Sequence, residues 1–358
     1  MVFVTLFTRL ENVHLLKDVG LIPYFLCRDY GYACTMVTKK NEKEYPYLKR
    51  EVKGLSIRFI RGKGAWYLIR NARRIDILNV YHLNLQSFVN LLIYRVMRKK
   101  GGRSYLKLDM DEAGLERLLK PGSVGFIKRR TMELADVASV ETKRIYRVLR
   151  KKYGSRILYL PNGYFGGGDE PQGGFHKENV ILTVGELGTE PKATDVLIKA
   201  FVKAAGDRTD WILKLVGPVA EGFRNPYPED PRIIFTGRIR DKDKLNGLYR
   251  QAKVFAFPSR HESFGIAMLE AQAAGDYLVS TEGVPAAKDI IGLTKAGRIV
   301  GVDDTNALAG ALKSLMDSGR DWDAEAVRIA AAVHESFRWE KLVPKLEERL
   351  EALTWSPS

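Results

Sequence analysis

Residues 254–275 constrain the fold of this chain more than any other stretch. They open with the apolar run Val-Phe-Ala-Phe, which is short enough for a buried strand and stops before Pro258. A polar turn follows, and then Ser263 is the predicted N-cap of a helix that continues to Ala274 and ends at Gly275. Such a strand–loop–helix unit predicts an open parallel α/β sheet with free backbone N–H groups at the carboxyl edge of its strand.

Two carboxylates flank the start of this predicted helix. Glu262 lies in the loop, and Glu270 follows eight positions later on the helix itself. Backbone N–H groups at a helix N-terminus favour phosphates, whereas carboxylates accept hydrogen bonds from hydroxyl groups. A nucleotide sugar offers both kinds of group, so the stretch predicts a site for its diphosphate and for its sugar and ribose hydroxyls.

Length and cysteine content narrow the class of protein. A chain of 358 residues suffices for about two domains. No apolar run approaches the roughly 20 residues that span a bilayer, and the apolar start lacks a signal-peptide pattern. Cys27 and Cys34 match neither a disulfide framework nor a zinc site. We therefore expect a soluble cytoplasmic protein.

The positive charge is concentrated in one half of the chain. Residues 1–160 contain 33 Lys and Arg against 14 Asp and Glu, whereas residues 161–358 have a net charge of −4. Such asymmetry predicts an acidic partner for the first half: nucleic acid, an anionic membrane or an anionic substrate. No helix-turn-helix, zinc or RNA-binding signature supports nucleic acid.

Apolar, β-branched runs predict a series of strands in the first half, over 2–8, 33–38, 55–61, 75–81, 104–108, 136–141 and 157–160. Two of them deliver polar residues at their carboxyl ends, namely His82 and Asp109. Site residues of open parallel sheets collect at these ends, although a purely structural histidine explains His82 equally well. The loop after the first strand lacks glycine until Gly20, so Arg9, His14 and Lys17 either contact ligands there or the loop contacts none.

From residue 180 onward strands and helices alternate, which predicts a second parallel sheet covered by helices on both faces. Strand-forming stretches are expected at 180–187, 211–218, 233–239, 277–281 and 298–302, and helices at 195–205 and 241–253. The glycine-rich stretch 163–179 is the predicted linker between the two domains.

The framed pair Pro-Ser-x-x-Glu-Ser-Phe-Gly-x-x-x-x-Glu-Ala resembles the E-x7-E signature of family-4 glycosyltransferases, which are retaining enzymes of the GT-B fold. Pro-Asn-Gly at 161–163 is also similar to a strand-end turn of these enzymes. The resemblance implies two doubly wound Rossmann-like domains that face each other across a cleft. Residues 1–165 would bind the acceptor, 166–340 the nucleotide sugar, and the helix at 341–358 would cross back onto the first domain.

The resemblance also implies roles for particular residues. Glu262 would bind the donor sugar, Lys192 the diphosphate and Glu270 the ribose, while His82 and Asp109 are candidates on the acceptor side. The donor would also contact a second set of residues: Gly185, Arg238, Ser263, Phe264 and Gly265. UDP is the expected nucleotide of the donor, and the chemistry of this fold calls for no metal ion or other cofactor.

Glu186 departs from the family pattern, because relatives carry arginine after the glycine that Gly185 matches. At an effective dielectric constant of about 20, two charges 4 Å apart interact by about 4 kcal/mol, so an inward-facing carboxylate would oppose diphosphate binding. Either Glu186 points away, or Arg238 or Arg240 supplies the missing charge, or activity is impaired. We favour the second alternative. The third corresponds to a catalytically impaired sugar-nucleotide-binding protein of the same fold.

The expected acceptor is a glycan or a lipid-linked glycan, as in the synthesis of cell-surface polysaccharides and glycoconjugates. Trp66 and Tyr67 lie among arginines in the stretch 62–74, and basic stretches also occur between 126 and 153. Aromatic and basic residues together suit a membrane interface, and they predict peripheral attachment at the inner face of the cell membrane. The alternative for 62–74 is a solvated helix that packs Trp66 on the sheet.

Overall fold

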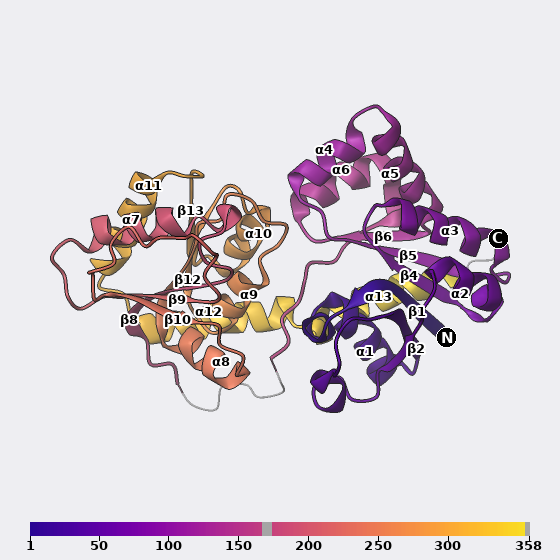
Figure 1. The fold of residues 1–358 in the computed structure, drawn as a ribbon, viewed down its shortest axis with the longest axis horizontal. Helices are drawn as coiled ribbons and strands as arrows, with labels where there is room; N and C mark the ends of the chain where they lie inside the picture. The colour runs from indigo at the N-terminus through magenta and orange to yellow at the C-terminus, as the bar shows by residue number, and fades with distance from the viewer. Residues whose placement is uncertain (167–173, 355–358) are drawn as a thin grey trace. The chain divides into compact units, whose positions relative to one another are not determined.

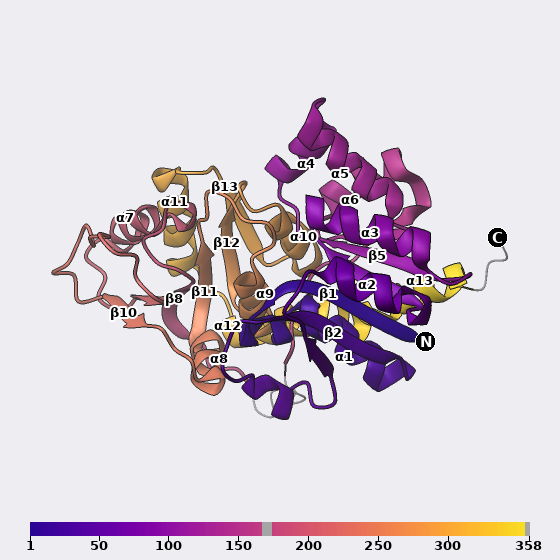
Figure 2. The same ribbon diagram turned by 45° about the vertical axis from the view of Figure 1, so that its right-hand side comes forward.

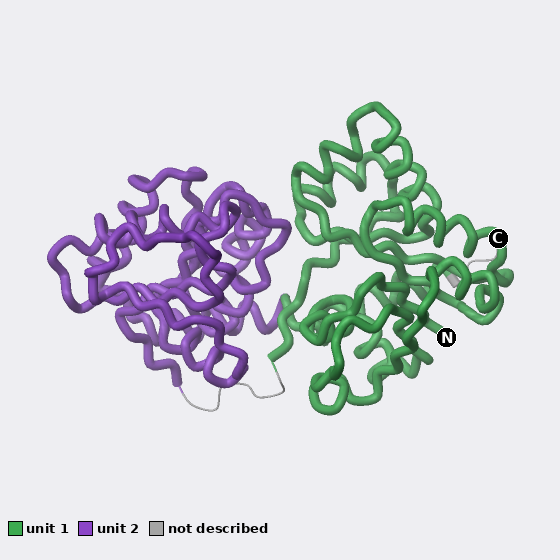
Figure 3. The backbone as a smooth tube through the Cα atoms, in the orientation of Figure 1, with its two compact units in different colours: residues 1–167, 337–358 green, residues 168–336 purple. Residues whose placement is uncertain are grey.

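The computed structural model describes residues 1–166 and 174–354. The chain forms two compact units (Figure 3): residues 1–167 with 337–358 make unit 1, and residues 168–336 make unit 2. Part of the predicted linker, residues 167–173, lies outside the described residues. The GT-B expectation of two Rossmann-like domains is confirmed, because each unit contains one parallel sheet with helices packed on it (Figure 1).

Unit 1 is built on a seven-stranded parallel sheet. Its strands follow the order β3 (Ser56–Phe59), β2 (Ala33–Lys40), β1 (Val2–Leu10), β4 (Ile77–Tyr81), β5 (Arg103–Leu108), β6 (Val137–Val140) and β7 (Ile157–Tyr159). All residues of the central strand β4 are buried, as expected for a strand covered on both faces.

One face of this sheet is covered by α1 (Asp18–Tyr30) and α13 (Trp339–Thr354), whose apolar side chains share one core. Trp339 and Leu346 are fully buried there beside Phe25, so the last helix of the chain packs on the first unit as expected. The opposite face is covered by a second set of helices: α2 (Gly64–Asn71), α3 (Leu85–Met97), α4 (Glu112–Leu119), α5 (Ser123–Leu134) and α6 (Lys143–Tyr153).

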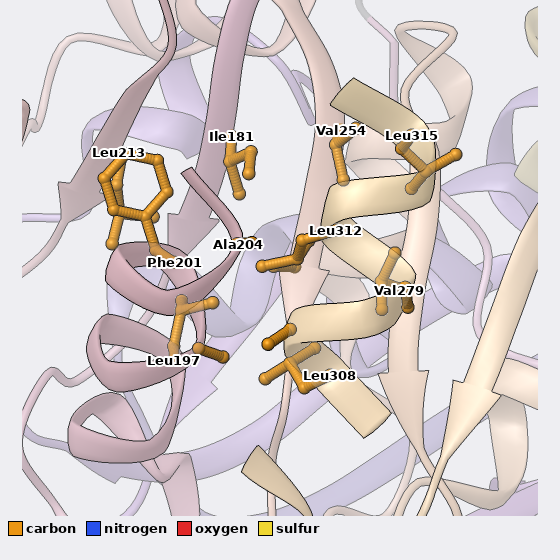
Figure 4. Close-up of a cluster of buried hydrophobic side chains, with 14 of the residues drawn as sticks. Ile181, Leu197, Phe201, Ala204, Leu213, Val254, Val279, Leu308, Leu312 and Leu315 are labelled. Atoms are coloured by element: carbon orange, nitrogen blue, oxygen red, sulfur yellow. The ribbon is translucent and has the colours of Figure 1, made fainter. Parts of the chain in front are cut away.

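Unit 2 is built on a six-stranded parallel sheet. Its strands follow the order β10 (Ile233–Gly237), β9 (Ile212–Val216), β8 (Glu178–Val184), β11 (Ala252–Phe257), β12 (Tyr277–Thr281) and β13 (Gly297–Val300). Two helices, α7 (Thr194–Ala205) and α11 (Thr305–Met316), pack side by side on one face, where Phe201 and Leu312 meet side chains of β8, β9, β11 and β12 (Figure 4).

The remaining helices of unit 2 are α8 (Lys242–Gln251), α9 (Ile266–Ala273), α10 (Pro285–Thr294) and α12 (Trp322–Phe337). Tyr249 of α8 contacts the ring of Phe255, and Met268 of α9 contacts Ser280. These two strand residues alternate with Val254 and Val279, which contact the α7–α11 layer. Helices α8 and α9 therefore cover the opposite face of the sheet.

Three local predictions from the sequence are wrong. Helix α8 ends at Gln251 instead of 253, because Ala252 already pairs with β8 as the first residue of β11. The stretch 62–74 does contain a helix, α2, but Trp66 is 60% exposed and does not pack on the sheet. The predicted N-cap Ser263 is the third error and is described below. Among the described residues, no helix is long and apolar enough to cross a membrane.

Candidate functional site

Two of the predicted residues meet at the carboxyl edge of the unit 2 sheet. Lys192 follows β8 in a short 3-10 helix (Glu190–Lys192), and Glu262 follows β11. The Lys192 ammonium forms an ion pair with the Glu262 carboxylate and lies 4.9 Å from the centroid of the Phe257 ring. Both charged side chains are about three-quarters buried, so each retains an exposed side that a ligand can contact.

Arg260 holds the two loops of this site together. Its backbone N–H donates to the carbonyl of Pro191 at 2.8 Å, and its Nη1 donates to the carbonyl of Glu190 at 2.5 Å. Its Nε lies 2.7 Å from the carboxylate of Asp303. The loop that carries Lys192 is thereby fixed against the loop that carries Glu262. The sequence did not single out Arg260, because only spatial proximity shows that it bridges the two loops.

Helix α9 begins at Ile266, two residues later than predicted, because Gly265 is its N-cap. Gly265 has a left-handed backbone with φ of 78°, which glycine adopts without the strain that a Cβ introduces. The side chain of Ser263 therefore does not cap the helix. Among the described residues, the amides of Phe264 and Gly265 have no hydrogen-bond partner, and Phe264 buries its ring. Both amides are available to an anionic ligand.

Glu270 lies on α9, and its carboxylate accepts a hydrogen bond of 3.2 Å from the hydroxyl of Tyr249. Tyr249 is almost fully buried, and burial together with the Glu270 carboxylate raises the pKa of its hydroxyl well above the usual value. The hydroxyl therefore acts as a donor that orients Glu270. The sequence did not predict that Tyr249 contacts Glu270, because the two residues are 21 positions apart on neighbouring helices.

Gly185 is located beside Lys192 in a pocket between the ends of β8 and β11. A Cβ at Gly185 would lie 3.7 Å from the Lys192 side chain, which is an ordinary van der Waals contact, so Gly185 and Lys192 are direct neighbours. Ser259 lines the same pocket and is 1% exposed, and its Oγ has no hydrogen-bond partner among the described residues. A buried hydroxyl without a partner is costly, so Ser259 is an additional candidate for ligand contact.

Glu186, which stands where the family pattern has arginine, has an exposed side chain. Arg238 and Arg240 are exposed as well, and Arg238 directly follows β10. Backbone hydrogen bonds join the ends of β8, β9 and β10. The N–H of Gly185 donates to the carbonyl of Val216, and the N–H of Gly217 donates to the carbonyl of Gly237. Gly185 and Arg238 thus lie two strands apart, about 10 Å at the usual strand spacing.

His82 and Asp109 belong to unit 1 and follow the neighbouring strands β4 and β5. Both side chains are exposed. His82 has a positive φ of 63°, and its N–H donates to the carbonyl of Lys107 at 3.1 Å. A non-glycine residue in this conformation is strained, so the sheet edge holds His82 in place.

A buried polar cluster lies beneath these two residues. The Lys107 ammonium is 2.6 Å from Glu141 and 3.6 Å from Asp18, and Lys107 itself is fully buried. Burial opposes the charged form of Lys107, but the two carboxylates outweigh it and raise the pKa of the ammonium. The cluster fixes the ends of β5 and β6 and the start of α1.

The glycine-free loop after β1 forms a 3-10 helix (Asn12–Leu16). His14 is occupied within this loop, because its Nδ1 accepts the N–H of Glu11 at 3.0 Å and its ring packs edge-on against Phe7. Burial lowers the pKa of His14, which favours the neutral imidazole. Arg9 and Lys17 remain exposed.

The sequence of this chain is similar to those of known glycosyltransferases. Residues 178–318 match the family model described as "Glycosyl transferases group 1". The chain is 29% identical over 193 residues to the phosphatidyl-myo-inositol mannosyltransferase of Mycolicibacterium smegmatis, over 52% of this chain and 49% of that protein. It is 34% identical over 191 residues to the D-inositol 3-phosphate glycosyltransferase of Corynebacterium urealyticum, over 50% and 44%. The chain thus spans about half the length of these curated relatives.

Solved structures resemble the whole chain. The Anabaena protein Alr3699/HepE in complex with UDP gives a TM-score of 0.74 at 14% identity, over 98% of this chain and all of that one. WaaG, a glycosyltransferase involved in lipopolysaccharide biosynthesis, gives 0.66 at 15% identity, over 99% and 100%. At these identities the likeness concerns the fold.

Two Rossmann-like units, each built on one parallel sheet, define a GT-B fold, and the second unit brings Lys192 and Glu262 together beside the start of a helix. The chain has the fold of GT-B glycosyltransferases, and its residues 178–318 match the model of their group 1 domain.

Proposed function

We propose that the protein is a retaining hexosyltransferase that moves a sugar from a UDP-sugar to a glycan or a lipid-linked acceptor. The observation that carries this proposal is the meeting of Lys192, Glu262 and the free amides of Phe264 and Gly265 at one edge of the unit 2 sheet. A cation, a carboxylate and two amide donors suit a diphosphate joined to a sugar.

Each group has a defined task in this proposal. Negative charge develops on the leaving diphosphate as its bond to the anomeric carbon breaks, and Lys192 and the two amides stabilise that charge. The diphosphate competes with Glu262 for Lys192, which frees the Glu262 carboxylate to accept hydrogen bonds from the sugar. Glu270 is oriented by Tyr249 and accepts the ribose hydroxyls. Cationic side chains supply the positive charge in this scheme, without a metal ion.

The proposed acceptor follows from unit 1 and from the relatives. A relative acts on phosphatidyl-myo-inositol by its name, and WaaG takes part in lipopolysaccharide biosynthesis. Residues 1–160 carry the excess of positive charge, which suits an acceptor that is itself anionic or is held at an anionic membrane. His82 and Asp109 are the proposed acceptor-side residues. We propose a cytoplasmic protein that attaches peripherally to the inner face of the membrane.

Thermal unfolding against a panel of nucleotide sugars tests the proposal. We expect a UDP-sugar to raise the unfolding temperature, since a ligand that binds only the folded state stabilises it. UDP release from that donor should then be measurable and should persist in EDTA. Stabilisation by no nucleotide sugar would contradict the proposal.

A second function of the same site is a sugar-nucleotide-binding protein without transferase activity. Glu186 supports it, because an exposed carboxylate takes the place of the family's arginine. The same assay separates the two functions. Stabilisation by a UDP-sugar with no release of UDP, with or without candidate acceptors, would favour the binding protein.

A further inference from the structure

Helix α3 is apolar on two opposite faces. Leu91 and Tyr94 point inward and are buried in the core of unit 1. Four further apolar residues recur at the opposite helical positions and are all exposed: Leu85, Val89, Leu92 and Val96. A surface helix of a soluble protein normally presents polar residues outward, so this second apolar stripe calls for an explanation. It extends over about 16 Å at the usual rise per residue.

Helix α2 continues the apolar surface. It packs against α3, as α5 does from the other side (Figure 2). Trp66 and Ile69 of α2 are exposed on the side of the helix that faces away from the buried Leu68. We call these six residues, Leu85, Val89, Leu92 and Val96 with Trp66 and Ile69, the α3 ridge.

The stretch of chain that carries the ridge is almost free of negative charge. Between Arg61 and Leu108 the chain has eleven Lys and Arg and a single acidic residue, Asp76. Asp76 is neutralised by the Lys99 ammonium at 2.6 Å. Within the described part of the chain, seven exposed bases of this stretch form no ion pair: Arg61, Lys63, Arg70, Arg73, Arg74, Arg95 and Lys100.

We propose that the α3 ridge is the membrane-docking surface of the protein and that its occupant is a bilayer containing anionic lipid. The apolar side chains of the ridge enter the boundary between headgroups and acyl chains, and the surrounding bases contact anionic headgroups. The indole of Trp66 is amphipathic and suits the headgroup level. This inference rests on the proposed function only in that a membrane-held acceptor gives docking a purpose.

Charge also argues against a second copy of the chain as the occupant. A two-fold dimer would bring the same surface of both copies together. The bases around one ridge would then face the bases around the other, with no unpaired carboxylate from residues 61–108 between them, and like charges across an interface are costly. An anionic bilayer instead offers negative headgroups to the bases and an apolar interior to the side chains of the ridge.

The test is co-sedimentation of the full chain with vesicles of phosphatidylcholine, alone or with about one-third phosphatidylglycerol. The triple variant Leu85→Gln, Leu92→Gln, Val96→Gln removes apolar surface from exposed positions and keeps good helix formers. We expect its bound fraction on anionic vesicles to fall about tenfold, because most of the inserting surface is gone. The matched control, Val219→Gln, Val302→Gln, Val327→Gln in unit 2, should bind like the wild type.

Trp66 reports on the ridge directly. Its emission should shift to the blue on anionic vesicles, and the shift should be absent in Trp66→Phe, because the indole leaves water when the ridge inserts. UDP binding by calorimetry should be equal in the wild type and in the triple variant, since the ridge is in unit 1. Loss of UDP binding in every protein would contradict the proposed function and leave the vesicle result standing.

Two results would overturn the inference. One is unchanged vesicle binding by the triple variant. The other is absence of vesicle binding together with a wild-type dimer that the triple variant converts to a monomer, which would make the ridge an interface between copies.

Discussion

Glu270 is the residue whose proposed role follows most directly from its surroundings. It is on the site helix, and a buried tyrosine hydroxyl orients its carboxylate. Glu262, the other glutamate of the motif, is instead paired with Lys192. The two glutamates therefore have different partners. The sequence singled out both glutamates through their spacing, and it singled out Lys192 because that residue matches the lysine of the family pattern. It did not predict Arg260 or Tyr249, whose contacts join residues that are distant in the chain.

Glu270→Ala should weaken UDP binding roughly ten- to hundredfold, because it removes a charge-assisted hydrogen bond of about 1.5–3 kcal/mol. Isothermal titration calorimetry measures the change. Glu270→Gln keeps one acceptor oxygen and should lose less affinity than Glu270→Ala. Equal UDP affinity in the wild type and both variants would remove Glu270 from the site.

Arg238 is the residue to test for the missing arginine of the clamp. Arg238→Gln should lower the affinity for UDP by about tenfold, since a charge-assisted contact to the diphosphate is lost. Glu186→Gln is the control, and it should change the affinity less than twofold because the exposed carboxylate is screened by solvent. If Glu186→Gln raises the affinity for UDP by more than Arg238→Gln lowers it, Glu186 faces the ligand.

At the scale of elements, the start of α9 is where prediction from the sequence failed. Ser263 followed by a helix-favouring run predicts an N-cap, but the left-handed turn at Gly265 delays the helix to Ile266. Glycine adopts both right-handed helical and left-handed backbone conformations, so the positive φ of Gly265 could not be predicted from the sequence. Most strand ranges were predicted within about two residues, since buried parallel strands are distinct apolar runs between polar segments.

Gly265→Ala should destabilise the protein by about 1–2 kcal/mol, the cost of a left-handed conformation for an L-residue. The added Cβ would also lie 3.0 Å from the Phe257 ring and 3.4 Å from Cγ of Glu262, so donor affinity should fall with it. Gly292→Ala in α10 is the control.

Gly292 has open space around its Cβ position, and alanine there should stabilise the protein by about 0.5–1 kcal/mol. Thermal unfolding midpoints of the two variants should therefore move in opposite directions. A Gly265→Ala variant as stable as the wild type would contradict the strained turn.

At the scale of the whole molecule, the sequence predicted two Rossmann-like units and the return of the last helix because alternating strands and helices are a long-range pattern. The exposed ridge on α3 could not be predicted in this way. Residues 85–97 are apolar on nearly every side, and periodicity alone does not tell which side faces water. Only the packing of α2 and α5 against α3 identifies the exposed face.

The central claim is that the site at the start of α9 transfers a sugar from a nucleotide donor with retention. Proton NMR of a UDP-sugar incubated with the protein tests this claim most directly, because it reports bond cleavage and the configuration of the sugar together. An α-linked donor should yield UDP and the α-configured product first, and Lys192→Met should slow this at least tenfold, since the leaving diphosphate loses its cation. A donor that binds and stays intact with every acceptor supplied, a β-configured first product, or an unchanged rate in Lys192→Met would contradict the claim.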